Sequence, residues 1–83
     1  MRIEWTRRAE REGSRLPART RERIVAALDR YAETESGDVR KLADVDPPEW
    51  RLRVGAYRVR FRRRGDVLEV LHVLRRDRAY RRR

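Results

Sequence analysis

The side chains of this sequence that could do chemistry are arginines, which alternate with apolar residues in two adjacent segments, residues 50–54 and 57–62. The segments are joined by Gly55-Ala56, and a glycine at the first of two linking residues is typical of a type II′ hairpin turn. Such a hairpin places two pairs of arginines directly opposite each other: Arg51 with Arg60, and Arg53 with Arg58. Opposed like charges destabilise a sheet, whereas the planar guanidinium group binds phosphate oxygens in a bidentate manner. The pattern therefore predicts an arginine platform for phosphates in preference to an ordinary solvated surface.

The single histidine, His72, is the other side chain that could act as an acid or base near neutral pH. When the strand register is extended through the next turn, His72 is expected on the apolar face beside Val59, and Arg75 on the arginine face. His72 is therefore predicted to be a structural residue in or near the core. In the same register Glu69 lies opposite Arg62, where we expect a cross-strand ion pair.

Metal and thiol chemistry have little support in the sequence. The acids Asp44, Asp46 and Glu49 lie in a proline-rich segment and are interpreted as turn residues rather than metal ligands. The chain has no cysteine, which excludes a disulfide scaffold and a thiol nucleophile. No glycine-rich phosphate loop and no Ser/His/Asp set is present, so we expect neither a metal nor another cofactor.

The distribution of charge indicates a polyanionic partner for the second half of the chain. The 83 residues include 24 Lys and Arg against 14 Asp and Glu, which gives a net charge of +10. Residues 1–42 carry a net charge of +3 and residues 43–83 carry +7, and a basic tail over residues 75–83 belongs to the second part. Such a local excess is expected to bind a phosphate backbone or an acidic protein segment.

The length and the hydrophobic pattern predict one small folded domain over residues 1–83. Hydrophobic residues make up 39% of the chain and occur at periodic positions, which argues against disorder. No segment approaches the roughly 18 apolar residues of a membrane span, and the first residues lack the apolar segment of a signal peptide. We therefore expect a cytoplasmic protein without a membrane partner.

The periodicity predicts an α+β domain of the order β-α-α-β-β-β, in which two helices pack on one face of an antiparallel meander sheet. The second helix carries an apolar stripe at Ile24, Leu28 and Tyr31. The expected elements are a strand around residues 3–5, a helix over 7–15 capped by Thr6, a helix from Pro17 to Ser36-Gly37, and meander strands over 50–54, 57–62 and 67–74. Residues 39–42 are a candidate for a further short strand.

Three parts of the sequence together resemble a known family. They are residues 50–59 (WRLRVGAYRV), the preceding residues 39–42 (VRKL), and an arginine-rich segment that ends in Tyr80-Arg81. With the break between two helices at Leu16-Pro17, these residues resemble the RelE/ParE superfamily of type II toxin–antitoxin toxins. The resemblance covers nearly the whole chain and implies a RelE-like fold with basic residues on the sheet face opposite the helices.

For the RelE branch, the resemblance implies ribosome-dependent cleavage of mRNA by an endoribonuclease (an mRNA interferase). The 2′-hydroxyl attacks the adjacent phosphate, and the protein stabilises charge and orients the substrate. The implied catalytic residues are Arg51, Arg53, Arg58, Arg75, Arg76 and Tyr80. Further arginines are expected to bind RNA: Arg60, Arg62, Arg78 and Arg81. Arg75 and Arg76 are alternatives for the family's arginine after the last strand. The face on which the side chain is expected favours Arg75, and the spacing to Tyr80 favours Arg76.

Two alternatives to the nuclease remain. The ParE branch, whose members inhibit DNA gyrase without cleaving RNA, shares the fold and a strand similar to residues 70–72. A non-toxic RNA-binding module would also account for the basic surface. In either toxin, the resemblance implies a cognate antitoxin with an acidic, partly disordered segment that folds on binding. For the nuclease it also implies mRNA on the ribosome as partner, and no small-molecule cofactor.

Overall fold

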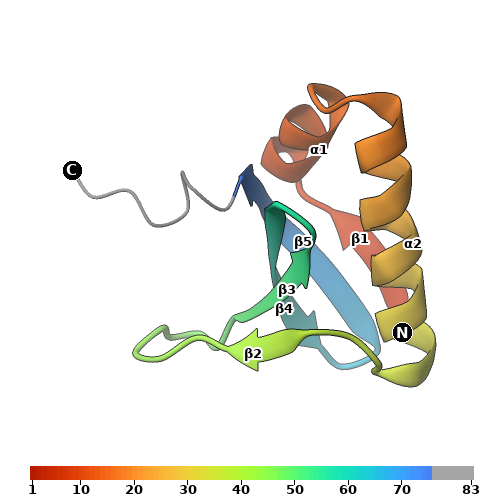
Figure 1. Ribbon diagram of the computed structural model, residues 1–83. Coiled ribbons are helices and arrows are strands. Elements are labelled where there is room, and N and C mark those ends of the chain that lie inside the picture. Colours follow the sequence, from red (N-terminus) through yellow and green to blue (C-terminus); the bar gives the residue numbers. More distant parts are fainter. Residues whose placement is uncertain (76–83) are drawn as a thin grey trace.

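The structure, a computed structural model, describes residues 1–75 and has two helices on one face of a single sheet (Figure 1). The predicted α+β class is confirmed, and the short strand expected over residues 39–42 brings the sheet to five strands. In chain order the elements are β1 (Arg2–Trp5), α1 (Arg7–Ser14), α2 (Ala18–Thr34), β2 (Val39–Lys41), β3 (Trp50–Val54), β4 (Tyr57–Arg64) and β5 (Val67–Arg75).

The sheet has the strand order β1-β5-β4-β3-β2. Strands β2 to β5 pair in antiparallel fashion, and β1 pairs with β5 in parallel, so the first strand closes one edge of the meander. Two-residue turns join β3 to β4 and β4 to β5, and they begin at Gly55 (φ 57°) and Gly65 (φ 55°). Positive φ favours glycine at these positions. The register of β3 on β4 contains both predicted arginine pairs, which confirms the predicted hairpin.

The helix ends follow from local capping. The Thr6 hydroxyl oxygen accepts a hydrogen bond from the Ala9 backbone N–H at 3.1 Å, as expected for an N-cap. Pro17 is the N-cap residue of α2, one position before the helix rather than within its first turn. Helix α2 ends where Glu35 adopts the left-handed conformation (φ 58°), slightly before the end expected at residues 36–37.

The hydrophobic core lies between the two helices and the sheet. The predicted stripe on α2 is buried, and the strands supply alternate residues from β3, β4 and β5. Helix α1 packs so closely against β1 that a Cβ atom at Gly13 would lie 3.3 Å from the Trp5 ring. The buried hydrophobic residues are Ala9, Ile24, Leu28, Tyr31, Leu52, Val59, Phe61, Leu68, Val70 and Val73.

The register between β4 and β5 differs from the predicted one because β5 contains a β-bulge. Arg60 pairs with His72, and the next β4 residue, Phe61, pairs with Val70. Leu71 is therefore an extra residue without its own partner on β4. An extra residue reverses the side-chain parity of every position that follows it.

Two predictions that depended on this parity are wrong. His72 lies on the arginine face of the sheet rather than on the core face beside Val59. Arg75 pairs with Tyr57 and lies on the helix side, with its guanidinium carbon 5.9 Å from the Tyr57 ring centroid. The predicted ion pair between Arg62 and Glu69 precedes the bulge and is confirmed, with a closest N···O distance of 3.6 Å.

Candidate functional site

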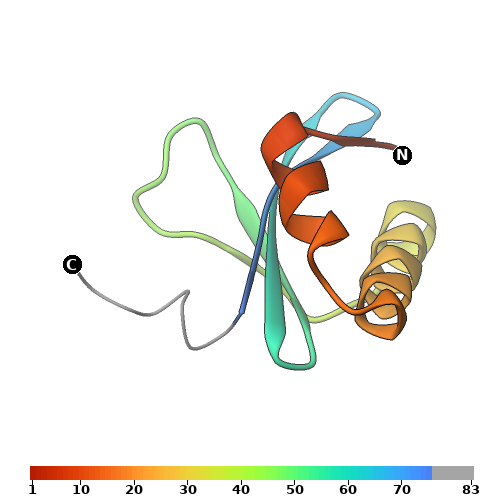
Figure 2. The same cartoon turned by 90° about the horizontal axis from the view of Figure 1, so that it is seen from above.

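The arginine face is the side of the sheet opposite the helices. The β2–β3 loop (residues 42–49) lies on this side, so the sheet separates the loop from α1 and α2 (Figure 2). Strands β2 to β5 bring together side chains that are far apart in the sequence. The basic residues on this face from β2, β3 and β4, with the histidine from β5, are Arg40, Arg51, Arg53, Arg58, Arg60, Arg62, Arg64 and His72.

One row of cross-strand neighbours on this face consists entirely of basic or titratable side chains. Arg51 of β3 pairs with Arg40 of β2 on one side and with Arg60 of β4 on the other. Arg60 in turn pairs with His72 of β5. The sequence predicted only the central pair, since the register of β2 on β3 is set across an eight-residue loop. Arg40 is thus a further candidate for the phosphate platform.

A hollow of about 320 Å³ lies between the β2–β3 loop and this part of the sheet. Three of the predicted platform arginines line it together with apolar side chains. Arg58 is almost completely buried there, with 4% of its surface exposed, whereas Arg51 and Arg60 are partly exposed. The lining residues are Leu42, Ala43, Val45, Arg51, Arg58, Arg60 and Leu74.

Glu49, at the end of the β2–β3 loop, contacts the arginine face directly. Its Oε1 atom accepts a hydrogen bond from Arg60 Nη2 at 2.5 Å, and its Oε2 atom lies 3.6 Å from Arg62 Nη2. Its side chain is only 13% exposed. The interpretation of Glu49 as a turn residue missed this role. The sequence contains a signal for this contact: Glu49 lies two positions before Arg51, and alternate residues of a strand project to the same face of the sheet.

The arginines near the β4–β5 turn form a network of ion pairs. Arg62 and Arg64 both contact Glu69, each with a closest N···O distance of 3.6 Å. Glu4 of β1 contacts Arg64 at 4.0 Å and Arg2 at 3.0 Å. We call these five residues the ion-paired half of the arginine face.

The opposite part of the face has a different charge balance, and we call it the cationic half. It consists of Arg40, Arg51, Arg53, Arg58 and Arg60. Within residues 1–75, Arg40, Arg51 and Arg53 have no acidic partner, and the Arg51 Nε atom is buried without a hydrogen-bond partner. Three pairs of arginines face each other in this half, and the carboxylate of Glu49 contacts Arg60, so this half has an excess of positive charge next to the hollow.

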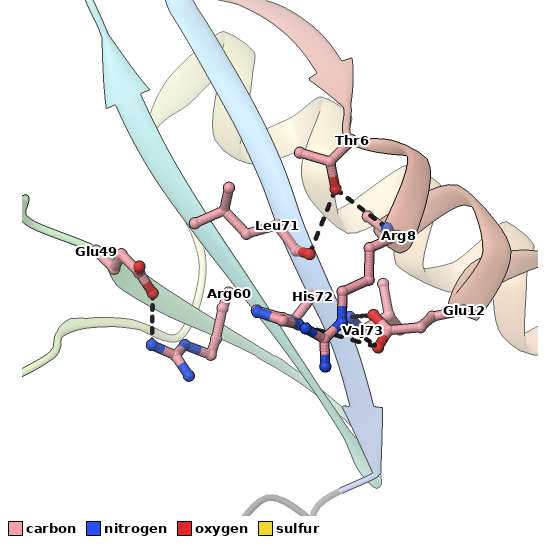
Figure 3. Close-up of polar contacts among 9 residues, drawn as sticks. Thr6, Arg8, Glu12, Glu49, Arg60, Leu71, His72 and Val73 are labelled. Carbon is pink, nitrogen blue, oxygen red and sulfur yellow. Dashed lines mark hydrogen bonds and ion pairs between the residues drawn. The ribbon is translucent and has the colours of Figure 1, made fainter.

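His72 lies at the end of the cross-strand row, between Arg60 and helix α1 (Figure 3). Its Nδ1 atom is buried, has no hydrogen-bond partner and lies 3.9 Å from the Glu12 carboxylate. Burial lowers the pKa of His72 below its usual value of 6.5, and the positive charges of Arg8 and Arg60 act in the same direction. Glu12 and Glu49 oppose this shift without cancelling it. The imidazole is therefore neutral at pH 7.

Not all predicted site residues come together on the arginine face. Arg51, Arg53, Arg58, Arg60 and Arg62 do, whereas Arg75 projects from the other side of the sheet. The remaining predicted residues, Arg76, Arg78, Tyr80 and Arg81, lie outside the described residues.

Among the residues that the structure describes, there is neither a cluster of metal-ligating side chains nor a membrane-spanning helix. Residues 1–75 contain no group of three or more His, Asp or Glu side chains that could hold a metal ion. Neither helix in this range is long and apolar enough to cross a bilayer.

Comparison with a protein-family model gives a match over residues 3–80, and the family is described as "ParE toxin of type II toxin-antitoxin system, parDE". The match covers all the elements described above except the first residue of β1. Among curated protein sequences, no relative matches the chain.

The fold is similar to that of several solved toxin structures. The RelB-RelE antitoxin-toxin complex from Methanococcus jannaschii gives a TM-score of 0.75 at 22% identity, covering 92% of this chain and 93% of that one. The archaeal RelE-RelB complex from Pyrococcus horikoshii OT3 gives 0.74 at 24% identity, with coverage of 93% and 96%. The YoeB/ParE toxin from Agrobacterium tumefaciens gives 0.71 at 24% identity, with coverage of 90% and 98%. At these identities the similarity establishes the shared fold.

Proposed function

Because the chain belongs to the ParE toxin family of type II toxin–antitoxin systems, we propose that it is a toxin that inhibits translation by cleaving mRNA on the ribosome. The observation that carries this proposal is the cationic half of the arginine face. Its opposed arginine pairs cost stability in the absence of an anion. A phosphate backbone supplies closely spaced anions that offset this repulsion.

The hollow supports a role in catalysis as well as binding. Arg51, Arg58 and Arg60 converge on it, so a single phosphate in the hollow can contact several guanidinium groups. When the 2′-oxygen attacks phosphorus, negative charge increases on the phosphate oxygens, and fixed cations stabilise that charge. Arginine stays protonated in proteins. These side chains therefore bind the phosphate and lower the barrier electrostatically, and another group has to accept the 2′-hydroxyl proton.

An antitoxin is the second partner in this proposal. Two of the similar structures are described as complexes of RelE with RelB, which supports an antitoxin for this chain. An acidic segment that folds on binding would pair with Arg40, Arg51 and Arg53. It would occupy the same surface as the phosphates and thereby inhibit the toxin.

Inhibition of DNA gyrase is a second candidate function, favoured by two observations. The matching family takes its name from the ParE toxin. Arg75, one of the predicted catalytic residues, lies on the helix side and not on the phosphate platform. In this case the cationic half would bind DNA or an acidic protein surface, and no RNA would be cut.

A cell-free translation system separates the two candidates. The full chain is added to ribosomes that translate a defined mRNA, and cleavage is mapped by primer extension, while gyrase supercoiling is measured in parallel. The proposal predicts mRNA cuts that require ribosomes and unchanged supercoiling activity. Loss of supercoiling with intact mRNA would instead establish the gyrase function.

Arg51→Gln is the informative variant for the site. We expect it to reduce the cleavage rate about 100-fold or more, as does removal of one fixed donor in other active sites. Arg58→Ala is less suitable, because Arg58 is 4% exposed and its removal also leaves a cavity. Arg64→Gln in the ion-paired half is the matched control and should cleave at close to the wild-type rate. A fully active Arg51→Gln variant would exclude this site.

A further inference from the structure

The proposed cleavage needs a proton acceptor that the arginines cannot supply, and His72 is a side chain on this face that can accept a proton. The bulge at Leu71 turns His72 onto the arginine face, where it pairs with Arg60. Figure 3 shows its ring between the side chains of Arg60 and Glu12. The side chain is 22% exposed, so the ring is held by its surroundings and still reaches the surface.

Helix α1 holds the carboxylate that orients this ring. Beyond Val70, no strand within residues 1–75 pairs with the outer edge of β5, and α1 packs against β5. The Glu12 Oε1 atom accepts a hydrogen bond from the Val73 backbone N–H at 2.8 Å. Its Oε2 atom accepts one from Arg8 Nε at 3.4 Å and lies 3.9 Å from His72 Nδ1. The position of Glu12 is therefore fixed by the strand that carries His72.

This arrangement favours one tautomer of the imidazole. A carboxylate beside Nδ1 favours the proton on that nitrogen, which leaves the lone pair of Nε2 as an acceptor. The lowered pKa of His72 keeps the ring neutral at pH 7. The groups that face the ring are Arg8 and Glu12 from α1, Arg60 from β4, and Glu49 from the β2–β3 loop. A neutral imidazole next to a phosphate-binding arginine is suited to general base catalysis.

We infer that His72 is the general base of the mRNA cleavage and accepts the 2′-hydroxyl proton on Nε2. This inference rests on the proposed function. The 2′-oxygen forms a bond to phosphorus, and the P–O5′ bond breaks with its electron pair remaining on the 5′-oxygen. That oxygen takes a proton from water, and the imidazolium of His72 releases the transferred proton to solvent. The products are a 2′,3′-cyclic phosphate and a 5′-hydroxyl end.

Glu12 is a positioning residue in this scheme, since it acts on the substrate only through the imidazole. Its neutral variant Glu12→Gln keeps an oxygen for the Val73 N–H but removes the charge beside Nδ1. We expect a smaller loss of rate than for a His72 variant, together with a lower apparent pKa in the pH profile. This pH shift distinguishes orientation of the base from simple support of the helix.

The test is the pH dependence of single-turnover mRNA cleavage on ribosomes by wild type and His72→Gln. For wild type, the rate should rise with pH through an apparent pKa below 6.5, because the base has to be unprotonated. His72→Gln should lose this dependence of the rate on pH and should cleave at least about 100-fold more slowly than wild type. Its affinity for RNA should stay within about threefold of wild type, since Arg51 and Arg60 are retained. Added imidazole should restore part of the rate to His72→Ala.

Several outcomes would overturn the assignment. A His72→Gln variant that cleaves as fast as wild type excludes His72 as the base, as does a parallel loss of affinity and rate. If the variants do not fold, a wild-type rate that is independent of pH in the acid range contradicts the assignment by itself. Wild-type protein that cuts no mRNA overturns the proposed function and this assignment together, whereas an active wild type with an active His72→Gln variant overturns only the assignment.

Discussion

The two halves of the arginine face share strand β4 and differ in their charge balance. In the ion-paired half, Arg62 and Arg64 share Glu69, and Glu4 bridges Arg64 and Arg2. In the cationic half, three pairs of arginines face each other, and the carboxylate of Glu49 contacts Arg60. Strand β4 contributes two arginines to each half, and the same kind of glycine turn joins it to β3 and to β5. The two halves therefore differ in how many acidic side chains lie among their arginines.

This difference separates the arginines that are held in ion pairs from those that, under the proposed function, contact a ligand. Ion pairs of partly exposed side chains contribute little each, but they remove repulsion between neighbouring cations. The cationic half keeps that repulsion, which lowers the stability of the fold. Such a loss of stability is typical of residues that serve binding rather than folding. The contrast explains why a net charge of +10 gives little information by itself. What matters is that Arg51, Arg58 and Arg60 line one hollow.

The largest expected effect comes from reversing the charge of Arg51. Arg51→Glu places a carboxylate between Arg40 and Arg60, so both neighbours gain an ion pair and become less available to phosphate. We expect the affinity for single-stranded RNA to fall about 100-fold. The melting temperature should rise by about 4 °C or more, because opposed like charges are removed. Fluorescence anisotropy and thermal unfolding measure the two effects.

The matched control for this prediction is Arg64→Glu, which makes the same charge change in the ion-paired half. It adds a carboxylate beside Glu4 and Glu69, so we expect a lower melting temperature and a change in RNA affinity of less than about threefold. Equal decreases of affinity in the two variants would show that the halves are equivalent and that total charge alone determines binding.

A smaller effect of opposite sign is expected for Glu49→Gln. In the wild type, the carboxylate of Glu49 contacts Arg60, which a phosphate in the proposed site would also contact. Its removal should raise the affinity for RNA about tenfold, while thermal stability decreases. Glu69→Gln removes the same charge from the ion-paired half and should raise the affinity less than about twofold. Similar increases of affinity for both variants would contradict a competing role for Glu49.

The smallest expected effect is on the pH dependence of stability. Because the folded protein lowers the pKa of His72, protonation favours the unfolded chain. The stabilising contribution of the neutral ring is complete above the unfolded pKa of 6.5 and is lost as the pH falls through the lower folded value. Between about pH 7.5 and pH 5.5, wild type should therefore lose more thermal stability than His72→Gln. Identical slopes for the two proteins would mean that the ring is not buried beside Arg8 and Arg60.

The part of the site that follows from local pattern was predictable from the sequence. Strict alternation fixes which residues share a face, and a glycine turn of two residues fixes the register, so the pairs of Arg51 and Arg53 with β4 were predicted correctly. The apolar stripe of α2 and the ion pair between Arg62 and Glu69 followed from the same periodicities.

The rest depended on irregularities that have no signal in the pattern. Val70 and Leu71 are both apolar, so nothing in the sequence marks the second as the extra residue of a bulge. That one residue changes His72 from a predicted core residue to a member of the arginine face. The position of Arg40 opposite Arg51 required the register across the β2–β3 loop, which local periodicity does not fix. The prediction for Glu49 as a turn residue overlooks that it extends the alternation of β3 by one residue and so projects to the same face as Arg51.

The central claim is that phosphates bind the cationic half and not the ion-paired half, and the salt dependence of RNA binding tests it most directly. The slope of the logarithm of the binding constant against the logarithm of salt concentration should decrease by about 0.7 for each phosphate of a single strand that the protein no longer binds. Arg51→Gln should reduce the slope by about this amount, and Arg64→Gln should leave it unchanged. An equal reduction in both variants, or none in Arg51→Gln, would contradict the claim.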